Sequence, residues 1–174
     1  MNIFGEKIVL RAIEPEDNKM LLELINDPET ERMLGGTSWP VSMDSQMKWY
    51  AHLDGSSSVL RCIVADQKDN SPLGTLIMNE IDQRNGVAHI HVKMAAGETR
   101  GKGYGTDAVN TIVQYAFEEL RLHCVFANVI SYNAASIRML EKCGFHRDGI
   151  LRERVYKQGK YFDEYTYSKL ATDE

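Results

Sequence analysis

The stretch that most constrains the fold is TRGKGYGTDAV, residues 99–109, which has glycines at the alternate positions 101, 103 and 105. An apolar run typical of a strand precedes it at 87–94, and a run with one apolar helical face follows it at 108–120. Glycine loses more backbone entropy on folding than any other residue, so this repetition indicates a need for bare peptide N–H groups. A strand followed by a glycine loop and the start of a helix is an arrangement that favours the binding of an anion by the loop. A turn required only by backbone geometry is the alternative.

Two common nucleotide motifs do not fit this loop. A P-loop requires G-x-x-x-x-G-K-[ST], whereas Gly105 is followed by Thr106 and Asp107, with no lysine. A dinucleotide fingerprint has G-x-G-x-x-G spacing after the first strand, whereas GKGYG has G-x-G-x-G spacing and lies far downstream of the first expected strand. The loop therefore matches neither of these nucleotide-binding motifs.

The composition is that of an ordinary globular protein. The chain has 174 residues, 43% apolar and 26% charged, so we expect a single domain over residues 1–174. No run approaches the ~20 apolar residues that span a bilayer, and the N-terminus lacks a signal-peptide pattern, so we expect a cytoplasmic protein with no membrane partner. The net charge of -5 argues against a nucleic-acid partner. The three cysteines lack C-x-x-C spacing, and we expect free thiols and no metal site.

Hydrophobic periodicity predicts an α/β chain with a mixed sheet. Regular secondary structure is expected to be interrupted at Gly35 and Gly36. Helices are expected at 14–27, at 42–54, after the glycine loop and at 133–145. Strands are expected at 7–13, 59–66, 71–81, 87–94 and 124–130, with two more within 151–170. This order places helices on the faces of the sheet.

The motif RGKGYGT resembles the pyrophosphate loop of the GNAT superfamily of N-acetyltransferases, (Q/R)-x-x-G-x-(G/A), with Arg100, Gly103 and Gly105 on its defining positions. The segment YAFEELRLHCVFANVISYNAASIRMLEKCGF is similar to the family's next strand and helix. The tail GILRERVYKQGKYFDEYTYSKL resembles the branch containing ribosomal-protein N-acetyltransferases and polyamine acetyltransferases. The resemblance covers roughly residues 8–170. It implies a mixed, mostly antiparallel sheet flanked by helices on both faces, and an acetyl-CoA-dependent N-acetyltransferase.

The resemblance also implies which residues hold acetyl-CoA. In the family, backbone N–H groups of the glycine loop bind the pyrophosphate, and the end of the preceding strand pairs with pantetheine like an added strand. One N–H group of that strand can polarise the thioester carbonyl. Asn133 is expected to bond the pantetheine arm. The residues expected to bind the co-substrate are Val92, Lys93, Met94, Arg100, Gly101, Lys102, Gly103, Tyr104, Gly105, Thr106, Asn133 and Ser136.

The base is expected on the strand before the glycine loop. An amine with a pKa near 10 is mostly protonated at neutral pH, so a group must take its proton. Many relatives carry a glutamate at the position aligned with His89. Placing Ala88, Ile90 and Val92 in the core turns His89 and His91 to the opposite face, toward the expected acceptor cleft. A histidine with a pKa of ~6.5 suits a base or the anchor of a water relay. A buried polar contact within the sheet is the alternative role.

The general acid is the point where the chain departs from the family. Many members carry a tyrosine seven residues after the asparagine, where it can protonate the leaving thiolate, and here that position is Leu140. Ser136, one helical turn earlier, is the nearest hydroxyl, and Tyr132 is a second candidate. A thiol with a pKa of ~8.5 also tolerates departure without a dedicated acid. The catalytic candidates are therefore His89, His91 and Ser136.

The acceptor amine stays open at this point: a ribosomal-protein or peptide N-terminus, a polyamine or an amino sugar. Trp39, Glu80, Asp163 and Glu164 are expected near the acceptor cleft, where they would meet a cationic amine. A catalytically silent acyl-CoA-binding regulatory domain is the alternative, because the tyrosine is missing. A Rossmann methyltransferase would need a glycine-rich turn after the first strand, and RAIEPED has none. The sequence leaves the oligomeric state open, although a homodimer is common in such families.

Overall fold

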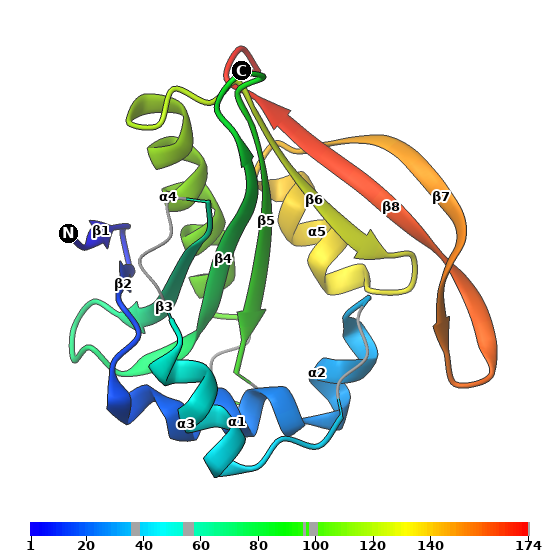
Figure 1. The fold of residues 1–174 in the computed structure, drawn as a ribbon. Helices are drawn as coiled ribbons and strands as arrows, with labels where there is room; N and C mark the ends of the chain where they lie inside the picture. Colours follow the sequence, from blue (N-terminus) through cyan, green and yellow to red (C-terminus); the bar gives the residue numbers. More distant parts are fainter. Residues whose placement is uncertain (36–38, 54–57, 96, 98–100, 174) are drawn as a thin grey trace.

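The computed structural model describes residues 1–35, 39–53, 58–95, 97 and 101–173. Across these residues eight strands form one sheet in the order β1-β2-β3-β4-β5-β6-β8-β7 (Figure 1). Neighbouring strands are antiparallel except β5 and β6, which are parallel. The elements in chain order are β1 (Ile3–Phe4), β2 (Ile8–Arg11), η1 (Pro15–Asp17), α1 (Asn18–Asn26), α2 (Pro28–Met33), α3 (Met43–Ala51), β3 (Leu60–Asp66), β4 (Pro72–Asp82), β5 (Val87–Met94), α4 (Tyr104–Glu118), β6 (Cys124–Ile130), α5 (Ala134–Lys142), β7 (His146–Lys157) and β8 (Lys160–Leu170).

Side-chain alternation along the strands gives the sheet two faces with different cover. The long helix α4 has a buried stripe, because Ala108, Ile112 and Ala116 recur every four residues and all are buried. This stripe packs with α5 against one face of the central strands and forms the main core. On the other face α1 covers a smaller cluster, made of Val9, Leu21, Ile63 and Ala65. The prediction of helices on both faces of a mostly antiparallel sheet is confirmed.

The parallel pair in the middle of the sheet opens into a V. β5 and β6 pair only from Val87↔Cys124 to His89↔Phe126, although β5 continues to Met94. Beyond that point β6 keeps its ladder with β8, and β5 keeps its ladder with β4. In the described part of the chain, no strand covers the edge of β5 that faces this opening beyond His89.

Most expected elements are present, and 87–94 and 124–130 are strands with the expected bounds. Two short elements were not expected. β1 has only two residues, too few to show alternation, and is held by pairing with β2. α2 begins after Asp27, whose carboxylate accepts a 2.7 Å hydrogen bond from the N–H of Thr30, with Pro28 as the first helical residue. β7 begins at His146 rather than at 151. The three cysteines are free, as expected.

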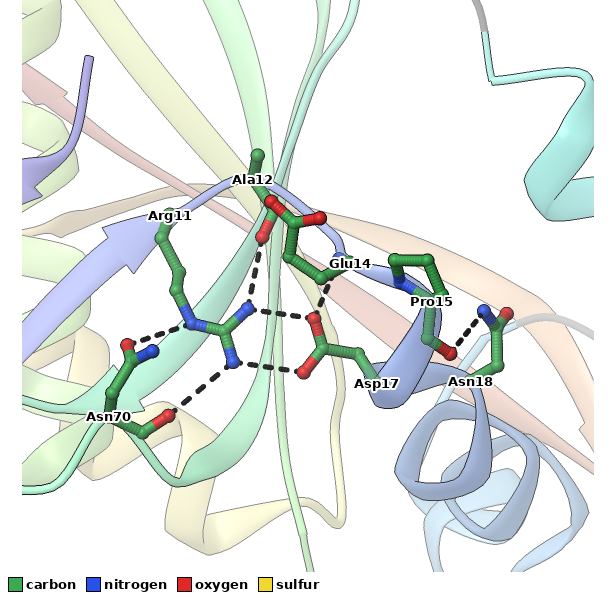
Figure 2. A network of polar contacts seen from close by, with 7 residues as sticks. All are labelled: Arg11, Ala12, Glu14, Pro15, Asp17, Asn18 and Asn70. Carbon is green, nitrogen blue, oxygen red and sulfur yellow. Dashed lines mark hydrogen bonds and ion pairs between the residues drawn. The ribbon is translucent and has the colours of Figure 1, made fainter.

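A polar network fixes the start of α1 against the sheet (Figure 2). Arg11, at the end of β2, donates two hydrogen bonds to the carboxylate of Asp17, of 2.7 and 2.9 Å, and one of 2.9 Å to the side chain of Asn70. The neighbouring Asn18 accepts a buried 3.0 Å hydrogen bond from Gln46 of α3. The network therefore sets where α1 and α3 lie relative to β2 and the β3–β4 turn.

Candidate active site

A cleft with a volume of about 330 Å³ lies where β5 and β6 diverge. That volume is within the range of about 300–1,000 Å³ that is common for small-molecule sites. β5, β6 and α5 form its walls, and the end of α2 and one residue of β8 close one side. The lining residues considered below are Glu31, His89, His91, Val92, Lys93, Asn133, Ser136, Leu140 and Glu164.

The two histidines of β5 both line this cleft, on the face predicted from their spacing. His89 is 7% exposed and stacks on Phe126, with ring centroids 4.5 Å apart. The His91 ring is solvent-exposed and lies 4.0 Å from the His89 ring, centroid to centroid. Within the described residues neither ring nitrogen of His89 has a hydrogen-bond partner, and Oε1 of Glu80 lies 3.7 Å from its Nδ1. His89 thus stands between an open histidine and a surface carboxylate.

Burial favours the neutral form of both histidines. Burial lowers the pKa of His89 below the ordinary 6.5, and the nearby Glu80 carboxylate opposes that shift. Burial, with the charges of His89 and Lys93, lowers the pKa of His91 to about 4. At neutral pH each ring therefore has a lone pair free to accept a proton.

The glycine loop leads directly into α4. Gly103 is the residue before the first helical turn, with φ +85°, and Gly101 has φ +77°, a region that favours glycine. A Cβ at Gly105 would lie 3.1 Å from Sδ of Met139 and 3.5 Å from Met94, so the loop touches the cleft wall and the end of β5. The loop therefore places a helix N-terminus beside the opening. Arg100 lies outside the described residues.

Contacts from far along the chain hold the loop in place. The carboxylate of Asp107, in the first turn of α4, accepts backbone N–H bonds from Glu6, Lys7 and Ile8. Nζ of Lys7 donates a 3.0 Å bond to the carbonyl of Lys102, which brings a cation to the loop. The hydroxyl of Tyr104 donates to Asp66, and Thr106 accepts a long bond from the thiol of Cys143. No sequence motif predicts that Lys7 lies at the glycine loop, because it is brought there only by the contact between the β2 region and α4.

The end of β5 presents the backbone expected to pair with pantetheine. Val92 and Lys93 line the cleft, and Met94 ends the strand beside the glycine loop. Because the ladder with β6 stops at His89, this edge has room for an added strand.

The start of α5 forms the opposite wall. Asn133 caps the helix, since its side-chain oxygen accepts a 3.1 Å bond from the N–H of Ser136, and its Nδ2 donates to the carbonyl of Met33. Both ends of this carboxamide are therefore engaged in joining α2 to α5. Ser136 lines the cleft, as does Leu140, which is 4% exposed and offers no proton.

The structure brings together only some of the residues expected near the acceptor. Glu164 lines the cleft, and burial raises the pKa of its carboxyl. Glu80 is 65% exposed but approaches His89. Within the described chain, Trp39 and Asp163 do not line the cleft. Trp39 is exposed, and the carboxylate of Asp163 accepts a hydrogen bond from a backbone N–H group of β7.

Two other residues near this wall are placed by long-range contacts. Tyr132 donates its hydroxyl hydrogen to the carbonyl of Arg32, so within the described residues it contributes no hydroxyl to the cleft. Glu31 lines the cleft and pairs with Lys157 at 2.5 Å, although nothing in the sequence near residue 31 suggests it.

Among the described residues, no cluster of three or more histidine, cysteine, aspartate or glutamate side chains is arranged to bind a metal ion. No helix in the described part of the chain has the length and apolarity needed to cross a membrane.

Comparison with known proteins agrees with the geometry. Residues 7–146 match the family model described as acetyltransferase (GNAT) domain. The chain is 30% identical over 175 residues to "Uncharacterized N-acetyltransferase p20" of Bacillus licheniformis, which covers 98% of this chain and 97% of that protein. It is 33% identical over 179 residues to "Putative ribosomal N-acetyltransferase YdaF" of Bacillus subtilis strain 168, which covers 97% and 94%.

Among solved structures, the spermidine N-acetyltransferase from Vibrio cholerae in complex with CoA and spermine has the same fold. The TM-score is 0.87 over 97% of this chain and 98% of that one, at 24% identity. The chain therefore belongs to the GNAT family of acetyltransferases and is an N-acetyltransferase.

Proposed function

We propose that this N-acetyltransferase moves the acetyl group of acetyl-CoA to a primary amine by direct attack, with both substrates bound together. The observation that carries the proposal is the cleft between β5 and β6. Its walls include His89 and His91, whose pKa values burial lowers, and Met139, which lies against Gly105 at the N-terminal end of α4. Release of free CoA thiol on mixing with acetyl-CoA and an amine tests it.

Backbone groups do most of the work of holding acetyl-CoA. The N–H groups of residues 101–106 and the N-terminal end of α4 bind the pyrophosphate, with the ammonium group of Lys7 nearby. The open edge of β5 from Val92 to Met94 binds the pantetheine arm as an added strand. An N–H group on this edge polarises the thioester carbonyl. The V. cholerae structure that shares this fold contains CoA, which supports the same co-substrate here.

The histidine pair removes the proton of the amine. The amine nitrogen attacks the thioester carbonyl, a C–N bond forms, and the C–S bond breaks. His91 faces the open cleft and accepts the amine proton, while His89 and then the exposed Glu80 provide a route for it to solvent. The departing CoA thiolate leaves as the anion, because its basicity is low, and takes a proton from water, either directly or through the Ser136 hydroxyl, which regains its own proton from water.

A silent acyl-CoA-binding regulatory domain is the second candidate, favoured by one observation. Leu140, buried in the cleft wall, offers no hydroxyl where relatives often carry tyrosine. Acetyl-CoA binding without thiol release on any amine would support this second function. The neutral histidines favour the enzyme, since a silent domain has no use for them.

Replacing Gly103 by valine is expected to weaken acetyl-CoA binding by about tenfold or more. The positive φ of +85° costs a residue with a side chain about 1–2 kcal/mol, and the added Cβ would lie 3.3 Å from Nζ of Lys7. Calorimetric titration measures the affinity. Gly159→Val is the matched control, because Gly159 has φ +79° in the β7–β8 turn with nothing within 4 Å. Equal affinities for the two variants would remove the loop from phosphate binding.

The rate of transfer is expected to fall at acid pH with an apparent pKa below 6.5. Burial favours the neutral form of both histidines, so they gain a proton, and cease to act as bases, only below the ordinary histidine value. The measurement is kcat against pH from about 3.5 to 8 at saturating substrates. The decline should disappear in a variant lacking both histidines. A midpoint at or above 6.5, or one that survives in that variant, would contradict the assignment.

A further inference from the structure

A second hollow, with a volume of about 320 Å³, lies between the helices α1 and α3 and the sheet, on the face that carries the histidines. We call it the tail pocket. Its walls are mainly apolar: Leu21, Leu24 and Ile25 come from α1, Trp49 from α3 and Ile77 from β4. The network of Arg11, Asp17, Asn18 and Gln46 holds these helices in place.

The tail pocket lies next to the catalytic cleft. Lys93 lines both hollows. Ile77, in the wall of the tail pocket, is the direct cross-strand partner of His91, so the two side chains lie on one face with their Cβ atoms about 4.5–5.5 Å apart. An amine held at His91 can therefore extend the rest of its molecule into the tail pocket.

Among the residues that the structure describes, two cations and no carboxylate line this apolar space. Arg61 of β3 and Lys93 of β5 approach it from the two strands that flank β4. In the part of the chain that the structure describes, neither side chain forms a hydrogen bond or ion pair, and both are only partly exposed. Burial lowers the pKa of Lys93, with no acidic neighbour opposing it. Unpaired cations in an apolar setting are costly, which favours an anionic ligand group.

Resting on the proposed acetyl transfer, we propose that the tail pocket selects an acceptor that joins a primary amine to an apolar side chain and an anionic group. This is the chemistry of a hydrophobic α-amino acid. Its amine meets His91, its carboxylate meets Lys93 and Arg61, and its side chain packs against α1 and Trp49. A polyamine would bring further positive charge to the same two cations, so it is disfavoured.

Matched acceptors test this assignment on the wild-type protein. L-phenylalanine, phenethylamine and L-phenylalaninamide share a ring and a primary amine, but only the first carries a carboxylate. With acetyl-CoA present, kcat/KM for L-phenylalanine is expected to exceed that for either analogue, and for spermidine, by about tenfold or more, the size of one charge-assisted contact. Preference for phenethylamine, spermidine or a peptide with an amidated apolar N-terminal residue would overturn the assignment.

The Arg61→Gln variant tests the contact itself. It should raise the KM for L-phenylalanine and weaken its calorimetric binding to the CoA complex by about tenfold, while phenethylamine changes by less than about twofold. Arg84→Gln makes the same change at an exposed turn and should leave both acceptors unaffected. Equal losses for both acceptors in Arg61→Gln would refute the carboxylate contact.

The two proposals fail in distinguishable ways. Binding of L-phenylalanine that depends on Arg61, without thiol release, would support the tail pocket and contradict the acetyl transfer. Thiol release only with acceptors that carry no anion would support the transfer and refute the tail pocket.

Discussion

Replacing His91 by alanine is expected to lower kcat for acetyl transfer by about 10²–10⁴-fold, the usual contribution of a positioned base. The His91 ring faces the open cleft, and the variant leaves an amine of pKa ~10 with water as its only proton acceptor. Acetyl-CoA affinity should stay within about twofold, since the proposed contacts of β5 with pantetheine use the backbone. Steady-state kinetics of thiol release and calorimetric titration measure the two quantities.

His146→Ala is the matched control, because His146 is exposed at the start of β7. It should leave both quantities unchanged. Added imidazole should restore part of the activity of His91→Ala, because the cleft is open where the ring is removed. Loss of acetyl-CoA binding in step with kcat would show a structural role and contradict the assignment of His91 as the base.

Replacing Asp17 by alanine is expected to lower the free energy of unfolding by about 3–5 kcal/mol, the typical cost of breaking a buried ion pair. Asp17 is 3% exposed and Arg11 11%, so the variant leaves a guanidinium with no carboxylate partner in a desolvated place. Because this pair fixes α1, the loss should also enlarge or disorder the tail pocket. Chemical denaturation measures the stability.

The exposed pair of Asp44 and Lys48 provides the control. Its N–O distance is also 2.7 Å, but the side chains are 72% and 75% exposed, so Asp44→Ala should cost less than about 1 kcal/mol. Replacing both Arg11 and Asp17 by apolar residues should recover much of the loss, since neither charge is then left unpaired. A small effect of Asp17→Ala alone would show that water reaches Arg11 and that the pair does not anchor α1.

Local sequence patterns predicted the parts of the site that lie on single elements. The glycine loop, the strand 87–94 and the alternation that turns His89 and His91 from the core each depend on residues close in the chain. Side chains alternate between the two faces of a strand, so placing the apolar neighbours Ala88 and Ile90 in the core puts both histidines on the opposite face.

Features made by distant segments had no such signal. The cleft exists because the ladder of β5 with β6 stops at His89, and nothing in the sequence marks that point. The pairing of Glu31 with Lys157 joins residues 126 apart. The tail pocket depends on where α1 and α3 settle over the sheet, which the buried contacts of Asp17 and Asn18 decide. Tyr132 was a reasonable acid by spacing, but its hydroxyl is held by Arg32.

The most direct test of the proposed acetyl transfer is thiol release by the wild-type protein with acetyl-CoA and a panel of amines. A calorimetric titration of acetyl-CoA comes first. The panel holds L-phenylalanine, spermidine, an amino sugar and short peptides with free N-termini. We expect saturable acetyl-CoA binding and amine-dependent thiol release, fastest with the amino acid. Saturable binding with no release on any amine, or no binding at all, would contradict the proposed transfer.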